Sequence, residues 1–152
     1  MNCKSRISEL LSAPFNLRTP APVAEISELR RQFSMSMSSD YFEFLLIGNG
    51  GCGGVGSGDY AMFWGSDEIP SYNLEYETNT YAPGLILFGS NGGGEAFAFD
   101  SSQGTLTIGI VPFVGLSLVE YRPMAQSFVE FLELLSSGVD YENVIGAALL
   151  RH

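Results

Sequence analysis

The segment 85–100 constrains the fold more than any other part of the chain. It consists of two apolar runs, 85–88 and 96–100, on either side of the turn sequence Gly-Ser-Asn-Gly-Gly-Gly-Glu. An Asn-Gly pair in such a connection supplies the positive φ values that a tight hairpin requires. We therefore predict an antiparallel hairpin whose turn is formed by Asn91, Gly92, Gly93 and Gly94.

Helical periodicity precedes and follows this hairpin. Apolar residues at helical spacing predict helices over 5–11, 23–33, 40–47, 127–137 and 141–150. The helix over 40–47 is almost wholly apolar, so we expect it to be buried on most sides. Asp40 is expected to cap this helix, and Ser127, three residues before Glu130, is expected to cap the next one.

The remaining segments are predicted to be strands and turns. Alternating apolar residues indicate strands over 60–64 and 105–111 and an extended stretch over 116–121. A linker is expected over 14–22, a loop with one helical turn broken by Pro70 over 66–76, and a glycine-rich turn at Asn49, Gly50 and Gly51. Helices, then a meander of strands, then helices predict an α+β fold, with an antiparallel sheet of about five to six strands and helices at both chain ends.

Length and composition favour one domain. The chain has 152 residues, of which 45% are hydrophobic, and we expect one domain over 1–152 with 1–22 as a less certain N-terminal arm. Every apolar run is far shorter than the roughly 18 residues of a membrane span. The apolar N-terminal stretch is broken by Ser8 and Glu9, unlike a signal peptide. Cys3 and Cys52 are expected to be isolated thiols, which agrees with a cytoplasmic location.

Negative charge is concentrated in the middle of the chain. The net charge is −10, and residues 32–121 contain no lysine or arginine but ten acids: Asp40, Glu43, Asp59, Asp67, Glu68, Glu75, Glu77, Glu95, Asp100 and Glu120. If these carboxylates form one patch, they repel nucleic acid and anionic membranes and attract a basic protein. The alternative is that they only aid solubility.

Most catalytic and cofactor sites lack the residues that they need. Residues 48–53 match the G-x-G-x-x-G pattern, but a predicted helix enters and a strand leaves, which is the reverse of a dinucleotide site. Lys4 is the only lysine, so there is no P-loop, and His152 is the only histidine, so no catalytic triad can be assembled. The sequence also lacks a zinc-ligand set and an EF-hand loop. We expect no cofactor and no metal.

Aromatic residues alternate with acids after the strand at 60–64. Such residues make good contacts for a cationic partner. The candidate partner-binding residues are Asp59, Trp64, Asp67, Glu68, Tyr72, Glu75, Tyr76, Glu77 and Tyr81. Two alternatives stay open: Trp64 is simply part of the core, or a carboxylate pair such as Asp67 and Glu68, or Glu75 and Glu77, serves a glycoside hydrolase.

Three blocks of sequence together resemble the SUKH superfamily. They are 40–51, with an apolar helix and a glycine stop, 88–100, with the glycine-rich hairpin, and 125–132, with an aromatic helix. The resemblance implies helices packed on a strongly bent antiparallel sheet and no catalytic residues. It also implies a protein-binding role: bacterial members are commonly immunity proteins against polymorphic or contact-dependent toxins, many of them nucleases, and a fungal branch regulates cell-wall synthesis. The expected partner is a cognate protein toxin or other basic protein; an intracellular regulatory or scaffold module is the alternative.

Overall fold

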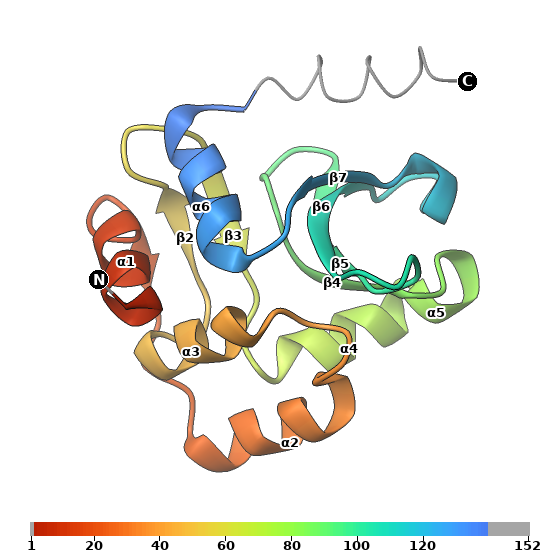
Figure 1. Cartoon of the computed structure of the whole chain (residues 1–152), viewed down its shortest axis with the longest axis horizontal. Coiled ribbons are helices and arrows are strands. Elements are labelled where there is room, and N and C mark those ends of the chain that lie inside the picture. Colours follow the sequence, from red (N-terminus) through yellow and green to blue (C-terminus); the bar gives the residue numbers. More distant parts are fainter. Residues whose placement is uncertain (1, 140–152) are drawn as a thin grey trace.

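The computed structural model describes residues 2–139 (Figure 1). The helix expected over 141–150 lies outside these residues. The main helices are α1 Cys3–Leu10, α2 Val23–Phe33, α3 Ser39–Ile47, α4 Glu68–Glu75, α5 Thr78–Tyr81 and α6 Phe128–Ser137. The helix predicted over 23–33 is confirmed with the same bounds. Ile26 and Leu29 are buried and the polar positions between them are exposed, as the predicted apolar stripe requires.

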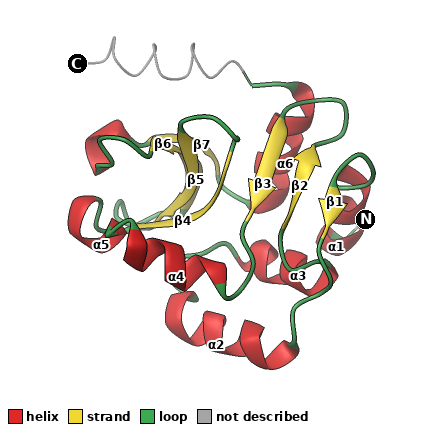
Figure 2. Cartoon of the chain, turned by 180° about the vertical axis from the view of Figure 1, so that it is seen from behind, coloured by secondary structure: helices red, strands yellow, loops and turns green. Residues whose placement is uncertain are grey.

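Seven antiparallel strands form a sheet in which each strand pairs with its neighbours in the sequence (Figure 2). They are β1 Asn16–Leu17, β2 Gly51–Gly54, β3 Tyr60–Phe63, β4 Leu85–Ser90, β5 Glu95–Asp100, β6 Thr107–Pro112 and β7 Arg122–Ala125. The α+β class and the consecutive antiparallel order are confirmed. The sheet has more strands than the five to six predicted.

The extra strands lie where loops were predicted. The linker 14–22 contributes β1, and the glycine-rich segment that begins at the predicted turn residue Gly51 forms β2. A side chain at Gly51 would place its Cβ 2.2 Å from the carbonyl oxygen of Asn16 on β1, so these strands approach closely because glycine is present. The stretch 116–121 contains a 3₁₀ turn, Leu118–Glu120, and β7 follows it.

Bulges bend the sheet at two places, and its curvature is visible in Figure 1. One bulge lies between Leu87 and Gly89 in β4, and the other lies in β7 at Met124, opposite Ile108 and Gly109 of β6. β3 pairs with β4 only through Met62 and Phe63, after which the chain leaves toward α4. Gly89 permits this junction, because a Cβ there would lie 2.1 Å from the Met62 carbonyl oxygen.

Aromatic side chains from both helical blocks fill the core on one side of the sheet. Tyr41 on α3 packs edge-on against Phe128 on α6, with ring centroids 4.8 Å apart. Phe88 and Phe99 stack at 4.2 Å on adjacent strands, and Phe97 meets Phe131 at 4.9 Å. The expected burial of the helix at 40–47 on most sides is confirmed, with Tyr41, Phe42, Phe44 and Leu45 all buried.

Asp40 has a different role from the one predicted. The residue before α3 is Ser38, and Asp40 lies in the first turn without capping it. Its carboxylate instead accepts hydrogen bonds from the backbone N–H groups of Phe128 and Val129, both at 3.0 Å, at the start of α6. Ser127 caps the same helix as predicted, since its hydroxyl accepts from Glu130 N at 3.1 Å. Two oxygen sources therefore satisfy the N-terminal donors of α6.

Most of the segment 66–76 is helix α4, Glu68–Glu75, rather than a loop with one helical turn. Pro70 occupies the third position of α4, where its missing N–H and fixed φ are tolerated, so it does not interrupt the helix. Glu77 then adopts a left-handed conformation with φ of 53°, and α5 begins at Thr78. This left-handed residue separates the two helices.

We expect Asp40→Ala to destabilise the fold by about 2–3 kcal/mol, because two donors at the α6 N-terminus lose a charged partner across 88 residues of chain. Ser127→Ala, which removes only the local cap, should cost about 1 kcal/mol. Urea denaturation monitored by circular dichroism measures both values. Equal losses for the two variants would contradict the special role of Asp40.

Candidate protein-binding surface

Helix α4 is held on the sheet by a side-chain amide. β3 pairs with β4 only near Ser90, so Leu87 presents its main chain on an edge without a neighbouring strand. The Asn73 amide takes that place: it donates to Leu87 O at 2.9 Å and accepts from Leu87 N at 2.9 Å. Figure 2 shows α4 lying along this part of the sheet. The helix therefore covers an edge that would otherwise be open to pairing.

An aromatic cluster forms where the chain passes from β3 into α4. The Trp64 and Tyr72 rings lie 4.7 Å apart, and Trp64 stacks on Tyr76 with centroids 6.5 Å apart and planes at 8°. Phe113, in the connection after β6, contacts Tyr76 at 5.0 Å. The structure thus brings together three of the four aromatic residues that the sequence singled out. It adds Phe113, which no local pattern could have associated with them.

Exposure differs sharply within this group. Trp64 is only 5% exposed, so the alternative that it belongs to the core is correct for most of its surface. Tyr76 is 39% exposed and rests on Trp64 and Phe113. Tyr81 is 56% exposed on α5, away from these ring contacts. Tyr76 is therefore a supported aromatic ring on an open surface.

Half of the ten central acids are already used within the fold. Asp40 caps α6, Asp59 accepts from Val139 N at 2.6 Å, and Asp100 accepts from Ser102 N at 2.8 Å. Glu43 pairs with Lys4 and Arg30, and Glu68 pairs with Arg18. The prediction of one patch made by all ten carboxylates does not hold for these five.

The other five central acids form no ion pair with any lysine or arginine in residues 2–139. They are Asp67, Glu75, Glu77, Glu95 and Glu120. Three of them belong to α4 or its ends, and two of these, Glu75 and Glu77, flank Tyr76 in the sequence. We define the α4 surface as Trp64, Asp67, Tyr72, Glu75, Tyr76, Glu77 and Phe113.

The ion pair of Glu68 fixes the charge of that residue. Partial burial by itself would raise the pKa of Glu68, but hydrogen bonds from the Gly65 N–H and from Arg18 outweigh burial and hold the pKa below its usual value. The hydrogen bond between Arg18 and Glu68 also raises the pKa of Arg18. A carboxyl that remains ionised is poorly suited to donate a proton as a general acid. The pairing therefore weighs against a hydrolase that uses Glu68 in that role.

The predicted turn residues organise two connections. Asn49 accepts from Ser66 N at 2.7 Å and so links the end of α3 to the start of the α4 region, while Gly50 has a φ of 85°. In the β4–β5 hairpin, Asn91 accepts from Gly93 N at 2.9 Å and Gly92 has a φ of 82°. A Cβ on Gly94 would meet nothing within 4 Å, so space does not require glycine there.

No metal centre or membrane helix is found in the part of the chain that the structure describes. Within residues 2–139, no three His, Cys, Asp or Glu side chains are arranged to hold a metal ion. None of the helices there combines the length and apolar character needed to cross a membrane. Cys3 and Cys52 are both free thiols, as the sequence predicted.

The low pKa of Glu68 predicts a pH-dependent contribution to stability. A carboxyl whose pKa is lower in the folded than in the unfolded state stabilises the fold above its unfolded pKa of about 4.3, and this contribution is lost as the pH falls through the folded value. Glu68→Gln should therefore lower the free energy of unfolding by up to about 1 kcal/mol at pH 7, and less as the pH approaches 3. Urea titrations over this range measure the difference, with Glu75→Gln as the unpaired control. If the difference in the free energy of unfolding between the unmodified protein and Glu68→Gln does not change with pH, the low pKa of Glu68 is contradicted.

Comparison with known protein families identifies the family to which the chain belongs. No individual curated protein is a significant match to the chain. The family model described as the SMI1 / KNR4 family (SUKH-1) matches residues 20–134, from the strand–helix connection before α2 through most of α6. The match includes the apolar helix, the glycine-rich hairpin and the aromatic helix on which the resemblance was based. The chain belongs to the SMI1 / KNR4 family (SUKH-1) of the SUKH superfamily.

Proposed function

We propose that this protein is a non-catalytic protein-binding module of the cytoplasm, an immunity protein that neutralises a cognate toxin or other basic protein. Membership of the family supports a protein-binding role. The observation that carries the proposal is Tyr76, a partly exposed ring supported by Trp64 and Phe113 and next in sequence to Glu75 and Glu77. The α4 surface is the proposed contact region.

The physical argument rests on how little this surface has to change on binding. Aromatic side chains that are already packed lose little conformational freedom when a partner covers them, which is why such residues dominate binding energies. The unpaired carboxylates beside Tyr76 attract lysine and arginine over distances of about 10 Å and speed association. A bound protein of this size blocks the partner's own active surface without any reaction in the immunity protein.

Two substitutions separate the aromatic and electrostatic contributions. Tyr76→Ala should weaken binding to the cognate toxin by about 2 kcal/mol or more, mainly through faster dissociation. The double variant Glu75→Lys with Glu77→Asn should slow association and flatten its salt dependence. Asparagine is chosen at position 77 because it tolerates the left-handed conformation found there. Surface plasmon resonance at several salt concentrations measures both effects.

Matched controls are taken from residues that do not belong to the α4 surface. Tyr60→Ala removes another exposed tyrosine, 44% exposed on β3, and Glu120→Lys reverses another unpaired acid. Both should bind like the unmodified protein and should protect cells that co-express the toxin. If the controls impair binding as much as Tyr76→Ala does, or if that variant protects fully, the α4 surface is not the binding site.

A further inference from the structure

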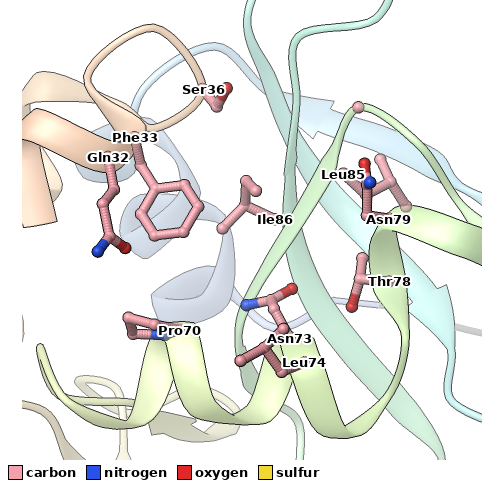
Figure 3. Close-up of a pocket in the computed structure, with 11 residues that line it drawn as sticks. Gln32, Phe33, Ser36, Pro70, Asn73, Leu74, Thr78, Asn79, Leu85 and Ile86 are labelled. Atoms are coloured by element: carbon pink, nitrogen blue, oxygen red, sulfur yellow. The ribbon is translucent and has the colours of Figure 1, made fainter.

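Two hollows of the described chain differ in the charge of their walls. A groove of about 520 Å³ lies beside α4, between this helix, the C-terminal end of α2, α5 and the start of β4 (Figure 3). Figure 3 shows the Phe33 ring and the Ile86 side chain next to each other, and none of the described residues that line the groove is charged. A smaller hollow of about 270 Å³ lies at the turn between β5 and β6, and its lining includes Asp100. Only the smaller hollow therefore has a charge that selects for one sign of ligand.

The register of the sheet brings three polar side chains together in this hollow. Asp100, at the end of β5, is the direct partner of Thr107, at the start of β6. Side chains of directly opposed residues project from the same face of a sheet, with Cβ atoms about 5 Å apart. The Thr107 hydroxyl in turn lies 2.9 Å from the Tyr121 hydroxyl. We define the Asp100 pocket as the hollow lined by these three residues, with Leu118 and Pro123 as its apolar wall.

Only one oxygen of the Asp100 carboxylate is used within the described fold. Asp100 is 5% exposed, yet it forms no ion pair with any lysine or arginine among residues 2–139. Its Oδ1 atom accepts a hydrogen bond from Ser102 N at 2.8 Å, as aspartate commonly does in a turn. The turn uses one oxygen, so the second oxygen and the negative charge are left for a ligand.

Arg122, the nearest base in the sequence, does not neutralise this carboxylate. Its Nη1 atom donates to the carbonyl oxygens of Val119 at 2.6 Å and of Tyr121 at 2.9 Å. Arg122 does not line the hollow, and it forms no ion pair with the acids among residues 2–139. The described part of the chain therefore supplies no counter-charge to Asp100.

The other polar groups of the Asp100 pocket are neutral acceptors. Burial raises the pKa of Tyr121, the hydrogen bond with Thr107 opposes this rise, and the Asp100 carboxylate adds to it, so the phenol stays protonated. A hydroxyl oxygen has two lone pairs, so the oxygens of Thr107 and Tyr121 can each accept from a further donor. Three acceptors beside an apolar wall suit a cation that is carried on an aliphatic chain.

We propose that the Asp100 pocket binds the ammonium group of a lysine side chain of the partner protein. This inference rests on the proposed function and deepens it by naming a side chain that is recognised outside the α4 surface. An ammonium has three N–H donors, and Asp100, Thr107 and Tyr121 each offer it an acceptor. A guanidinium pairs best with both oxygens of a carboxylate, and Ser102 N already occupies one of them. The pocket therefore favours lysine over arginine.

Three small compounds test the proposal directly, in about 0.15 M NaCl to screen non-specific attraction to the acidic protein. Nα-acetyl-lysine methylamide should produce saturable shifts in ¹H–¹⁵N spectra of the full chain, including the backbone amides of Ser102 and Thr107, with a dissociation constant of about 1–10 mM. The norleucine counterpart, which lacks the ammonium, should not saturate. The arginine counterpart should bind at least about threefold more weakly than the lysine compound. Saturable binding of the norleucine compound, tighter binding of the arginine compound, or shifts that avoid the pocket would overturn the proposal.

A matched pair of variants locates the site. Asp100→Asn keeps an oxygen that can accept from Ser102 N but removes the charge. Glu95→Gln makes the same charge change at the other end of β5, at an acid that has no ion pair among residues 2–139 and does not line the pocket. We expect Asp100→Asn to reduce affinity for the lysine compound at least about tenfold and Glu95→Gln to change it less than about twofold. Equal effects would show that the compound is held by overall charge and would refute a pocket site.

A second substitution tests the pocket without changing any charge. Tyr121→Phe keeps the ring and removes only the hydroxyl that lies beside Thr107. It should weaken binding of the lysine compound at least about threefold, because one acceptor of the ammonium is lost. The measurement remains decisive if Asp100→Asn does not fold. Unchanged affinity in Tyr121→Phe would contradict the three-acceptor site.

Toxin binding separates this inference from the proposed function. Asp100→Asn should weaken binding to the cognate toxin at least about fivefold, and Glu95→Gln should leave it unchanged. If the lysine compound does not bind while the protein still protects cells from the toxin, the pocket assignment is wrong and the proposed function stands. If the compound binds in the pocket but the toxin is neither bound nor neutralised, the pocket assignment stands and the proposed function is wrong. A toxin affinity that Asp100→Asn leaves unchanged would overturn the assignment of the pocket to the partner.

Discussion

Two neighbouring residues on α3 hold the rest of the structure together. The Asp40 carboxylate satisfies the N-terminal donors of α6, and the Tyr41 ring packs on Phe128 at the start of that same helix. The Tyr41 hydroxyl also donates to Trp64 O at 2.7 Å, where β3 ends and the α4 surface begins. Burial raises the pKa of Tyr41 well above its usual value, so the hydroxyl remains a donor throughout the physiological pH range. One turn of helix thus connects the core, the C-terminal helix and the candidate binding surface.

The fold divides the acidic residues into two classes that the charge count could not separate. Asp40, Asp59 and Asp100 are short side chains that accept backbone hydrogen bonds, a role that requires a carboxylate close to the main chain. Glu43 and Glu68 are paired with bases from the N-terminal part of the chain. The bases outside the acidic segment therefore neutralise part of it in space, although no base lies within it in sequence. Of the five central acids without an ion pair to a described base, three belong to α4 or its ends.

Features with local causes were predictable, and features produced by distant contacts were not. The stripe at 23–33, the Asn-Gly hairpin and the Ser127 cap each depend on residues within a few positions of one another, and each was found. β2 was not predicted, because Gly51 and the neighbouring glycines show no alternation of apolar and polar residues. Glycine is needed at Gly51 because β1 approaches it closely. Asp40 was assigned to the wrong helix because its partners are 88 residues away. The contact between Phe113 and Tyr76 was not predictable for the same reason, since the two residues are far apart in the sequence.

The position of α4 explains why one short helix can provide two distinct surfaces. Tyr72 and Tyr76 lie four residues apart and pack on Trp64, whereas Pro70 and Leu74, also four apart, line the groove. Asn73 joins the helix to the main chain of β4, so the orientation that creates one surface also creates the other. The outer edge of the sheet at β7 contains Pro123, and β1 at the opposite edge has only two residues, which makes both edges poor templates for strand addition. The described strand edges therefore offer little for recognition by strand addition.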